Sequence, residues 1–213
     1  LPYLQTKEGL SAQIVHGINI FDKFFGRKPT GFWLPECAFS PGIDKILFEE
    51  GIRYTFVDEH AIKHASPTPS NGVPIYSPHG IMLFPRNEKV SNQVWSAVNG
   101  YPGDIDYREF YRDIAYERDW EYIQPYMHSE GIRFDTGLKY SRVTGNTELK
   151  EYYIRDKALT KAREHSEHFI YTIEENLVKN VKQKNPPNII VTAFDAELFG
   201  HWWFEGPDWL LLV

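Results

Sequence analysis

Apolar side chains recur at helical spacing between residues 8 and 25, which predicts an amphipathic helix that ends at Gly26. A short apolar run at residues 31–34 predicts a buried strand. A second helix is predicted over residues 40–50, with a serine as N-cap and a proline in its first turn, and a second strand over residues 54–57. Because helices and strands alternate at short spacing, the pattern predicts an α/β protein with a parallel sheet or barrel.

Prolines and glycines punctuate residues 66–106, and short apolar pieces lie between them at 73–76 and 81–84. This pattern predicts a long excursion with one hairpin that stands over the sheet. Long loops inside compact α/β domains are usually functional or disordered. A short helix is predicted to follow at residues 107–114.

Residues 150–184 are mostly polar, with apolar positions at helical spacing, and predict a long helix broken at most once. Asn185 and two prolines end it. The apolar run at 188–194 then predicts a buried strand.

Hydrophobic types make up 42% of the 213 residues, enough for one sizeable core, and the length predicts a single domain. The 23 basic and 29 acidic residues give a net charge of −6, with no block of Lys or Arg. This balance argues against nucleic acid and anionic membranes as partners, since both need a clustered basic surface. Aromatic residues reach 15%. They fit either an aromatic-rich core or a sugar-binding cleft, in which ring faces stack on the C–H faces of pyranoses.

The chain has one cysteine, which excludes an intramolecular disulfide and a zinc site built on several thiolates. We expect a reducing compartment and a cytoplasmic location. No apolar run approaches the roughly 20 residues of a membrane span, and no signal peptide is visible. The chain starts at Leu1 without a methionine and stops on the apolar run 209–213, so we expect both ends to be cuts through a longer chain.

Two carboxylates stand out by position. Glu36 follows the predicted strand at 31–34, and Asp195 follows the predicted strand at 188–194. In a parallel α/β barrel both would lie at the carboxyl edge of the sheet, where active sites are built. We expect partial desolvation there to separate their two pKa values, as acid/base catalysis requires. The alternative is that each acid only caps a helix or lies in a loop.

Residues 194–207 combine an acid, a histidine and two adjacent tryptophans in one strand-to-helix turn. Adjacent side chains on a helix point about 100° apart, so Trp202 and Trp203 cannot both face a core. We expect one of them to be presented to a ligand or to another domain.

A weaker grouping consists of Asp58, Glu59, His60 and His64, which resembles a metal-binding pair at i and i+4. No further ligand is evident nearby, and zinc needs three or four. We therefore predict no metal site and favour surface histidines, with Asp58 and His60 as candidates to line a cleft. The sequence marks no partner base for Cys37, so a small buried thiol is favoured over a nucleophile.

Two segments resemble signature regions of glycoside hydrolase family 57, namely residues 31–39 (GFWLPECAF) and 193–203 (AFDAELFGHWW). The latter segment is most similar to the 1,4-α-glucan branching enzymes of that family. Residues 93–97 (QVWSA), 100–104 (GYPGD) and 107–113 (YREFYRD) also resemble the branching group. The resemblance covers nearly the whole chain.

This resemblance implies an incomplete seven-stranded β/α barrel, with residues 1–213 in one catalytic domain and a helical region that starts after about residue 207. It implies a retaining mechanism with Glu36 as nucleophile and Asp195 as general acid/base, and it calls for no cofactor. Retaining carboxyl groups lie about 5–5.5 Å apart. The substrates would be α-1,4-glucan chains as donor and acceptor. Transfer to a 6-hydroxyl gives a branch, transfer to a 4-hydroxyl gives chain transfer, and transfer to water gives hydrolysis.

His201 and Trp202 are the best candidates for substrate contact, because they follow Asp195 directly. Trp33 precedes Glu36 and belongs either to the core or to the site. Arg86 and Trp95 lie on the long excursion, which either reaches the cleft or is a spectator. The full set of expected substrate contacts is His201, Trp202, Trp33, Asp58, His60, Arg86 and Trp95.

The first regions of the family, including a His-rich motif on the first strand, and its last signature have no counterpart in these 213 residues. We therefore expect a barrel truncated at both ends and an isolated fragment that is poorly soluble and inactive, because lost strands leave open sheet edges. Three alternatives stay open. They are an α-amylase or 4-α-glucanotransferase of the same family, a non-catalytic α-glucan-binding protein, and a metal-dependent polysaccharide deacetylase on a related barrel.

Overall fold

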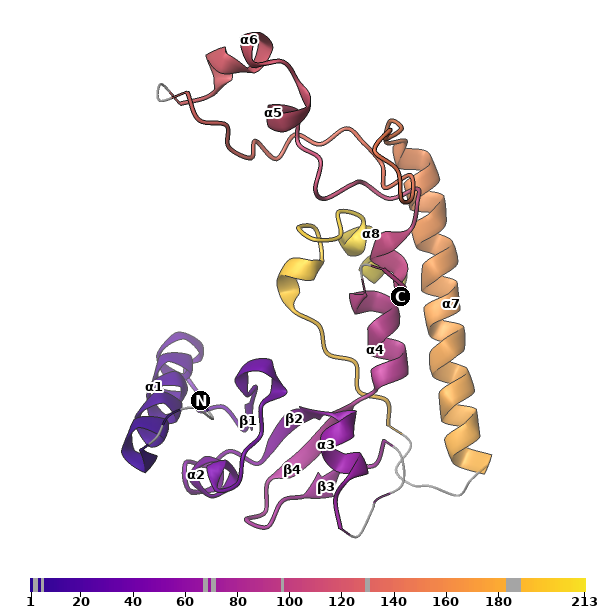
Figure 1. Ribbon diagram of the computed structural model, residues 1–213. Helices are drawn as coiled ribbons and strands as arrows, with labels where there is room; N and C mark the ends of the chain where they lie inside the picture. The colour runs from indigo at the N-terminus through magenta and orange to yellow at the C-terminus, as the bar shows by residue number, and fades with distance from the viewer. Residues whose placement is uncertain are drawn as a thin grey trace. The chain divides into compact units, whose positions relative to one another are not determined.

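The computed structural model describes residues 1, 4, 6–66, 69, 72–96, 98–128, 131–182 and 189–213 (Figure 1). The chain folds into two compact units. Unit 1 comprises Leu1–Glu88 and Asn176–Ala193, and unit 2 comprises Lys89–Glu175 and Phe194–Val213. The assignment of the whole chain to one catalytic domain stays a prediction.

Unit 1 contains a mixed sheet with the strand order β1-β2-β4-β3. β2 runs parallel to both β1 and β4, whereas β3 is antiparallel to β4. The α/β class predicted from the sequence is therefore confirmed. The helices and strands of unit 1 are α1 (Lys7–Phe25), β1 (Gly31–Phe32), the 3-10 turn η1 (Pro35–Cys37), α2 (Ile43–Glu49), β2 (Tyr54–Asp58), α3 (Glu59–Lys63), β3 (Ile75–Tyr76) and β4 (Met82–Arg86).

The expected excursion at 66–106 is wrong in its middle part. β3 and β4 do form the predicted hairpin, but β4 pairs along its whole length with β2 and so belongs to the sheet. The register places Tyr54 beside Met82 and Asp58 beside Arg86. Proline at position 85 misled the prediction, although its missing N–H faces the edge away from β2, where no ladder bond to β2 is lost.

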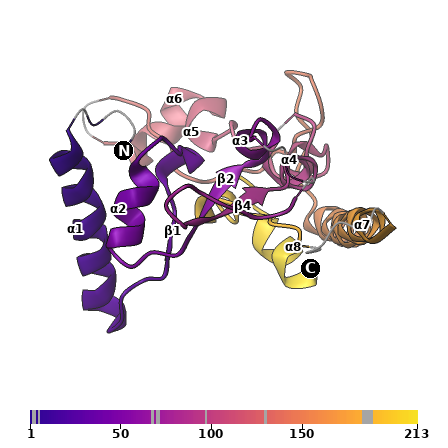
Figure 2. The same cartoon turned by 90° about the horizontal axis from the view of Figure 1, so that it is seen from below.

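The core of unit 1 lies where α1 and α2 pack side by side, as both views show (Figures 1 and 2). Ile14 and Ile18 of α1 belong to one buried cluster with residues of α2, such as Leu47, and of the sheet, such as Val57 and Leu83. α1 confirms its prediction closely: the Thr6 hydroxyl accepts the N–H of Gly9 at 3.1 Å, and Gly26 ends the helix in the left-handed region.

The start predicted for the second helix is wrong. α2 begins at Ile43, and its N-cap is Gly42 with φ 90°, not Ser40. The Ser40 carbonyl accepts the N–H of Ile43 at 3.2 Å, so Ser40 and Pro41 form a turn that precedes the helix. Glycine takes this left-handed position because a side chain there would be strained.

The predicted strand at 188–194 is also wrong over its described residues, which make a single parallel bridge between Val191 and Arg86. β2 occupies one edge of β4, and β3 occupies the other edge as far as Leu83. On that second edge the next donor position belongs to Pro85, which has no N–H. The next N–H on that edge, that of Asn87, reaches the segment and donates to the Val191 carbonyl at 2.8 Å.

Unit 2 is built around aromatic side chains. Trp203 lies 5.4 Å from Tyr107 and 5.3 Å from Trp209 between ring centroids, and His165 stacks on Tyr101 at 4.4 Å. These distances confirm that part of the aromatic content forms an aromatic-rich core, one of the two alternatives left open by the composition. The elements outside the sheet are α4 (Glu88–Trp95), η2 (Tyr101–Gly103), α5 (Ile114–Glu117), α6 (Trp120–Ile123), η3 (Gln124–Tyr126), α7 (Arg155–Lys182), η4 (Ala196–Leu198) and α8 (Gly206–Leu212).

Two helix predictions in unit 2 are corrected by extended pairing. Residues 107–109 are not helical, because Tyr107 and Glu109 exchange backbone hydrogen bonds with the segment 141–143. The helix α5 starts only at Ile114, where the buried Asp113 accepts the N–H of Ala115 at 2.9 Å as N-cap. The long helix starts at Arg155 rather than at residue 150, since residues 151–153 also pair with 140–142. Its predicted end at Asn185 lies outside the described residues.

Among the described residues, no helix is both long and apolar enough to cross a membrane.

Candidate active site

Three predicted site residues of unit 1 lie at one edge of its sheet. Asp58 ends β2, Arg86 ends β4, and Glu36 follows β1 on the turn η1. Because these strands are parallel, their carboxyl ends meet at the same edge, which is where α/β proteins place their sites. The strand-end position predicted for Glu36 is therefore confirmed, although its expected partial burial is wrong, since its side chain is exposed.

The backbone at Glu36 adopts an unusual conformation. Glu36 has φ 56° and ψ 27°, and Cys37 has φ 52°, so two successive non-glycine residues lie in the left-handed region. Each such residue costs about 1–2 kcal/mol, and costs of this kind concentrate at functional sites. The turn buries Leu34 and Cys37 on either side of the carboxylate and leaves Glu36 in solvent. The buried thiol predicted for Cys37 is thus confirmed.

β1 is a two-residue strand that opens with a glycine for a steric reason. A Cβ at Gly31 would lie 2.3 Å from the ring of Tyr54 on β2. Trp33 follows directly, with 41% of its surface exposed and its ring 5.8 Å from that of Phe56. It therefore packs partly on the sheet and keeps a surface available beside Glu36.

Asp58 and Arg86 form an ion pair at the edge of the sheet. Nη2 of Arg86 lies 2.8 Å from Oδ1 of Asp58, and Nε donates to the same oxygen at 3.2 Å. Both side chains are half-buried, so the ion pair holds the Arg86 donors and the Asp58 acceptor oxygens in fixed positions. His60 is exposed on α3.

The metal-binding interpretation of this region gains no support. The carboxylate of Asp58 is engaged by Arg86, and Glu59 accepts the N–H of Glu88 at 3.0 Å. Across the described ranges, no group of three His, Cys, Asp or Glu side chains is placed to hold a metal ion.

In unit 2, Asp195 opens a loop that closes on itself. Asp195 is the N-cap of η4, its carbonyl accepts the N–H of Leu198 at 3.1 Å, and its side chain is exposed, contrary to the expected desolvation. The N–H of Trp202 then donates to the Glu197 carbonyl at 3.3 Å. Gly200 makes the reversal with φ 95°. This folding brings the backbone of Trp202 back to the segment that begins with Asp195.

The two adjacent tryptophans separate as predicted. Trp203 is 1% exposed and joins the aromatic core, whereas Trp202 is 46% exposed. Trp202 lies 4.5 Å from Phe110 and 5.3 Å from His201 between ring centroids. Trp95, the last residue of α4, is also exposed, but no ring contact joins it to this group among the described residues.

Glu205, which the sequence did not single out, is a buried carboxylate at the end of the same loop. Its side chain is fully buried, and Oε1 accepts the N–H of Arg108 at 3.2 Å. Burial raises the pKa of Glu205, and hydrogen bonding from the Tyr153 side chain, followed by that from the Arg108 backbone, opposes that rise. The Arg108 guanidinium covers the ring of Phe204 at 3.5 Å. These contacts tie the Asp195 loop to the segment that carries Phe110.

Glu205→Gln is expected to raise the melting temperature at pH 8, with a gain that shrinks toward pH 4. A carboxyl whose pKa is raised in the folded state stabilises the fold below its unfolded pKa, and this contribution is lost as pH rises through the folded pKa. Glutamine keeps the acceptor for Arg108 without a charge. Calorimetry of the full-length protein at both pH values checks this, with the exposed Glu121→Gln as control. A gain that is equal at both pH values would contradict it.

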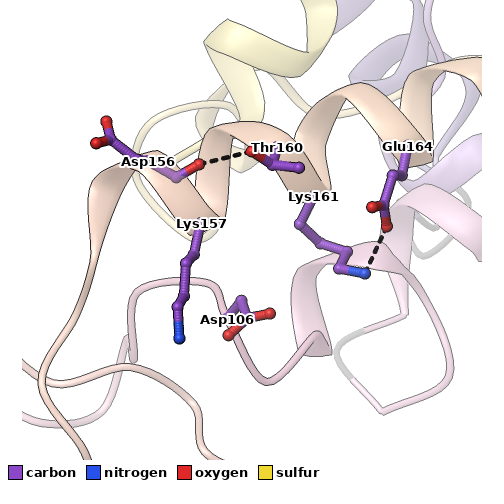
Figure 3. A pocket seen from close by; sticks show the side chains of 6 residues that line it. All are labelled: Asp106, Asp156, Lys157, Thr160, Lys161 and Glu164. Carbon is purple, nitrogen blue, oxygen red and sulfur yellow. Dashed lines mark hydrogen bonds and ion pairs between the residues drawn. The ribbon is translucent and has the colours of Figure 1, made fainter.

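An open pocket of about 310 Å³, lined by residues of charged and polar types, lies beside the first turns of α7 (Figure 3). Lys161 and Glu164 form an ion pair in its wall at 2.5 Å, and the lining residue Asp106 pairs with Arg142, which lies outside the lining, at 3.0 Å. It contains none of the predicted site residues and no stacking ring, so we do not assign the chemistry to it. Its lining residues are Asp106, Asp156, Lys157, Thr160, Lys161 and Glu164.

Comparison with known proteins gives a consistent result. The chain matches the family described as Glycosyl hydrolase family 57 over residues 1–193. It is 34% identical to a 1,4-alpha-glucan branching enzyme of Thermococcus kodakarensis, over 99% of this chain and 33% of that protein. It is 33% identical to a probable 1,4-alpha-glucan branching enzyme of Mycobacterium tuberculosis, over 87% of this chain and 32% of that protein. The chain thus spans about a third of the length of these relatives.

Solved structures share the fold of this chain. The alpha-amylase AmyC from Thermotoga maritima is 41% identical with a TM-score of 0.89, over 98% of this chain and 41% of that one. A GH57-type branching enzyme from Pyrococcus horikoshii is 37% identical with a TM-score of 0.81, over 98% of this chain and 38% of that one. The similarity therefore covers both units and the segments that hold Glu36 and Asp195.

Proposed function

The chain belongs to glycosyl hydrolase family 57, and from this premise we propose that it is part of the catalytic domain of a retaining 1,4-α-glucan branching enzyme. The enzyme would cleave an α-1,4 link in one glucan chain and transfer the released segment to a 6-hydroxyl. Relatives named as branching enzymes support this choice. Donor and acceptor would both be α-1,4-glucans.

The observation that supports the proposal most directly is the turn at Glu36. This turn places an exposed carboxylate at the end of β1, on a backbone with φ 56° that the buried neighbours Leu34 and Cys37 hold in place. A nucleophile has to be presented to substrate in one orientation, and a strained, anchored turn meets that need. A carboxylate that only capped a helix would not require this conformation.

The two carboxylates would share the chemistry in two steps. Asp195 protonates the glycosidic oxygen while Glu36 attacks the anomeric carbon, so the C–O bond breaks and a glucosyl ester forms on Glu36. Asp195, now a carboxylate, takes the proton of the acceptor hydroxyl, which attacks the same carbon and releases Glu36. Retention requires carboxyl groups about 5–5.5 Å apart, and this separation stays a prediction.

Around these groups we propose an incomplete seven-stranded β/α barrel, of which the sheet of unit 1 is one part, and a helical region that starts near α8. Trp33, Trp202 and His201 would contact sugar rings. Asp58, His60, Arg86 and Trp95 are proposed as further contacts, and the ion pair of Asp58 with Arg86 supplies fixed hydrogen-bonding groups for hydroxyls.

A specific observation favours a second candidate within the family. A second branching-enzyme structure, from Thermococcus kodakaraensis, is 34% identical to this chain with a TM-score of 0.78, over 98% of this chain and 40% of that one. The alpha-amylase structure exceeds both branching-enzyme structures, with an identity of 41% and a TM-score of 0.89. Hydrolysis and branching share both carboxylates and differ in the acceptor. An α-amylase or 4-α-glucanotransferase is therefore the alternative.

The test is to incubate the full-length protein with linear amylose and record the anomeric protons by NMR. We expect new α-1,6 signals at constant reducing-end concentration. Reducing ends without α-1,6 signals would replace the proposal by the amylase, and redistributed chain lengths without either would replace it by the 4-α-glucanotransferase. Binding of amylose with none of these changes would favour a non-catalytic binding protein.

A further inference from the structure

Trp202 and His201 of the Asp195 loop belong to a larger aromatic surface, which also includes the rings of Phe110 and Tyr111. We propose that Phe110 and Tyr111 complete it as a platform for the glucan chain, with Tyr111 as a stacking ring and Phe110 as the positioning residue that holds Trp202. This inference rests on the proposed function, because it specifies how the same site would hold its polysaccharide. Both residues lie in segment 107–113, which resembles the branching group, but the sequence gave neither of them a role in substrate binding.

Phe110 is the centre of this platform. Its ring centroid lies 4.5 Å from that of Trp202 at an angle of 32°, 5.3 Å from His201 and 5.1 Å from Tyr111, the last two edge-on. Trp202 and Tyr111 are 46% and 78% exposed. The half-buried Phe110 thus supports two exposed rings and orients both.

The backbone under Phe110 and Tyr111 is held from both sides. The N–H of Tyr111 donates to Oε1 of Glu109 at 3.0 Å, and the N–H of Glu109 donates to the Ser141 carbonyl at 2.9 Å. The Lys139 amine donates to the Phe110 carbonyl and lies 5.0 Å from the Phe110 ring. A surface held in this way loses little conformational entropy on binding, which favours a preformed site over a mobile loop.

The second side of the platform is equally fixed. Trp203 is buried in the aromatic core, so the neighbouring Trp202 is directed outward. The buried Glu205 joins this loop to the Phe110 segment through the N–H of Arg108. The Asp195 loop and the segment with Phe110 and Tyr111, which supply the rings, are therefore held together by this hydrogen bond within unit 2.

The chemistry of this surface fits a neutral sugar chain. Exposed ring faces stack on the C–H faces of pyranoses, while the His201 ring, the Tyr111 hydroxyl and the Lys139 amine offer hydrogen bonds to hydroxyls. The location argues for substrate rather than a protein partner, because Trp202 belongs to the loop that starts with Asp195 and is hydrogen-bonded back onto it. A glucan held here would therefore contact the same loop that carries Asp195, the proposed general acid/base.

The test combines calorimetric binding of maltoheptaose with kinetics on amylose and on a short aryl α-glucoside, using the full-length protein. For Tyr111→Ala we expect the Kd for maltoheptaose and the KM for amylose to rise about two- to twelvefold, the factor that one aromatic contact contributes. Phe110→Leu is expected to act similarly, and Phe110→Tyr to restore the wild-type values. The kcat on the aryl glucoside should stay unchanged, because that substrate is too short to need the platform.

Tyr122→Ala is the matched control, since Tyr122 is another exposed tyrosine of unit 2, and it should leave Kd and KM unchanged. Kd and KM within a factor of two of wild type for both Tyr111→Ala and Phe110→Leu would overturn the platform, as would a wild-type protein that does not bind maltoheptaose. Weaker binding by Tyr111→Ala in a protein that turns over no glucan would instead refute the proposed function and keep the platform.

Discussion

Glu36→Gln should abolish glucan turnover, lowering kcat on amylose by on the order of 10⁴-fold or more, as expected when the covalent nucleophile is removed. An amide in place of the carboxylate cannot form the glucosyl ester, although it keeps nearly the same shape. Glu36 is exposed and has no hydrogen-bonded side-chain partner among the described residues, so the folded state should be unaffected. The measurement is kcat on amylose for the full-length variant, alongside its melting temperature.

The matched control for this variant is Glu49→Gln. Glu49 is an exposed glutamate of unit 1. Its Oε1 lies 4.0 Å from Nζ of Lys45 on the same helix, which makes a surface ion pair. Its substitution should leave kcat within a factor of two. A Glu36→Gln protein that folds and retains more than a tenth of the wild-type kcat would remove Glu36 from the nucleophile's role.

Asp195→Asn should lower kcat/KM on amylose by about 10²–10⁴-fold, the usual contribution of a general acid/base. The loss should be much smaller on an aryl α-maltoside with a good leaving group, because departure of that group needs no proton. Azide should then rescue turnover of the aryl α-maltoside and yield an α-maltosyl azide, since this nucleophile needs no general base. The measurement is the ratio of kcat/KM on the two substrates, with product analysis after azide addition.

Glu197→Gln provides the control, because Glu197 is the next acidic side chain of the same loop and is also exposed. It should leave the ratio between the two substrates as in wild type. An Asp195→Asn protein that loses the same factor on both substrates and does not respond to azide would show that Asp195 holds the loop together rather than transferring a proton.

The parts of the fold that the sequence predicted well are those decided by local chemistry. Thr6 and Gly26 bound α1 because a hydroxyl N-cap and a left-handed glycine act within a few residues. β1 and β2 were found because short apolar runs between turns have few alternatives. The errors arose where distant pairing decides. Residues 107–109 pair with 141–143 instead of forming a helix, and Pro85 limits the segment around Val191 to one bridge.

The candidate site divides in the same way. Glu36 was predictable as an acid after an apolar strand, and the separation of Trp202 from Trp203 followed from their adjacency. The roles inferred for Phe110 and Glu205 could not be read from the chain, because they arise from contacts with residues more than 90 positions away, as between Arg108 and Glu205. The expected burial of both carboxylates was wrong, since η1 and η4 turn them toward solvent.

Trapping the covalent intermediate would decide whether Glu36 is the nucleophile of a retaining enzyme. The full-length Asp195→Asn protein would be incubated with α-maltosyl fluoride, whose leaving group needs no acid, and digested for mass spectrometry. We expect the peptide containing Glu36 to gain the mass of the transferred maltosyl group, and the double variant with Glu36→Gln to gain none. A maltosyl group found on a different residue, or fluoride release without any adduct on Glu36, would refute the proposed double displacement.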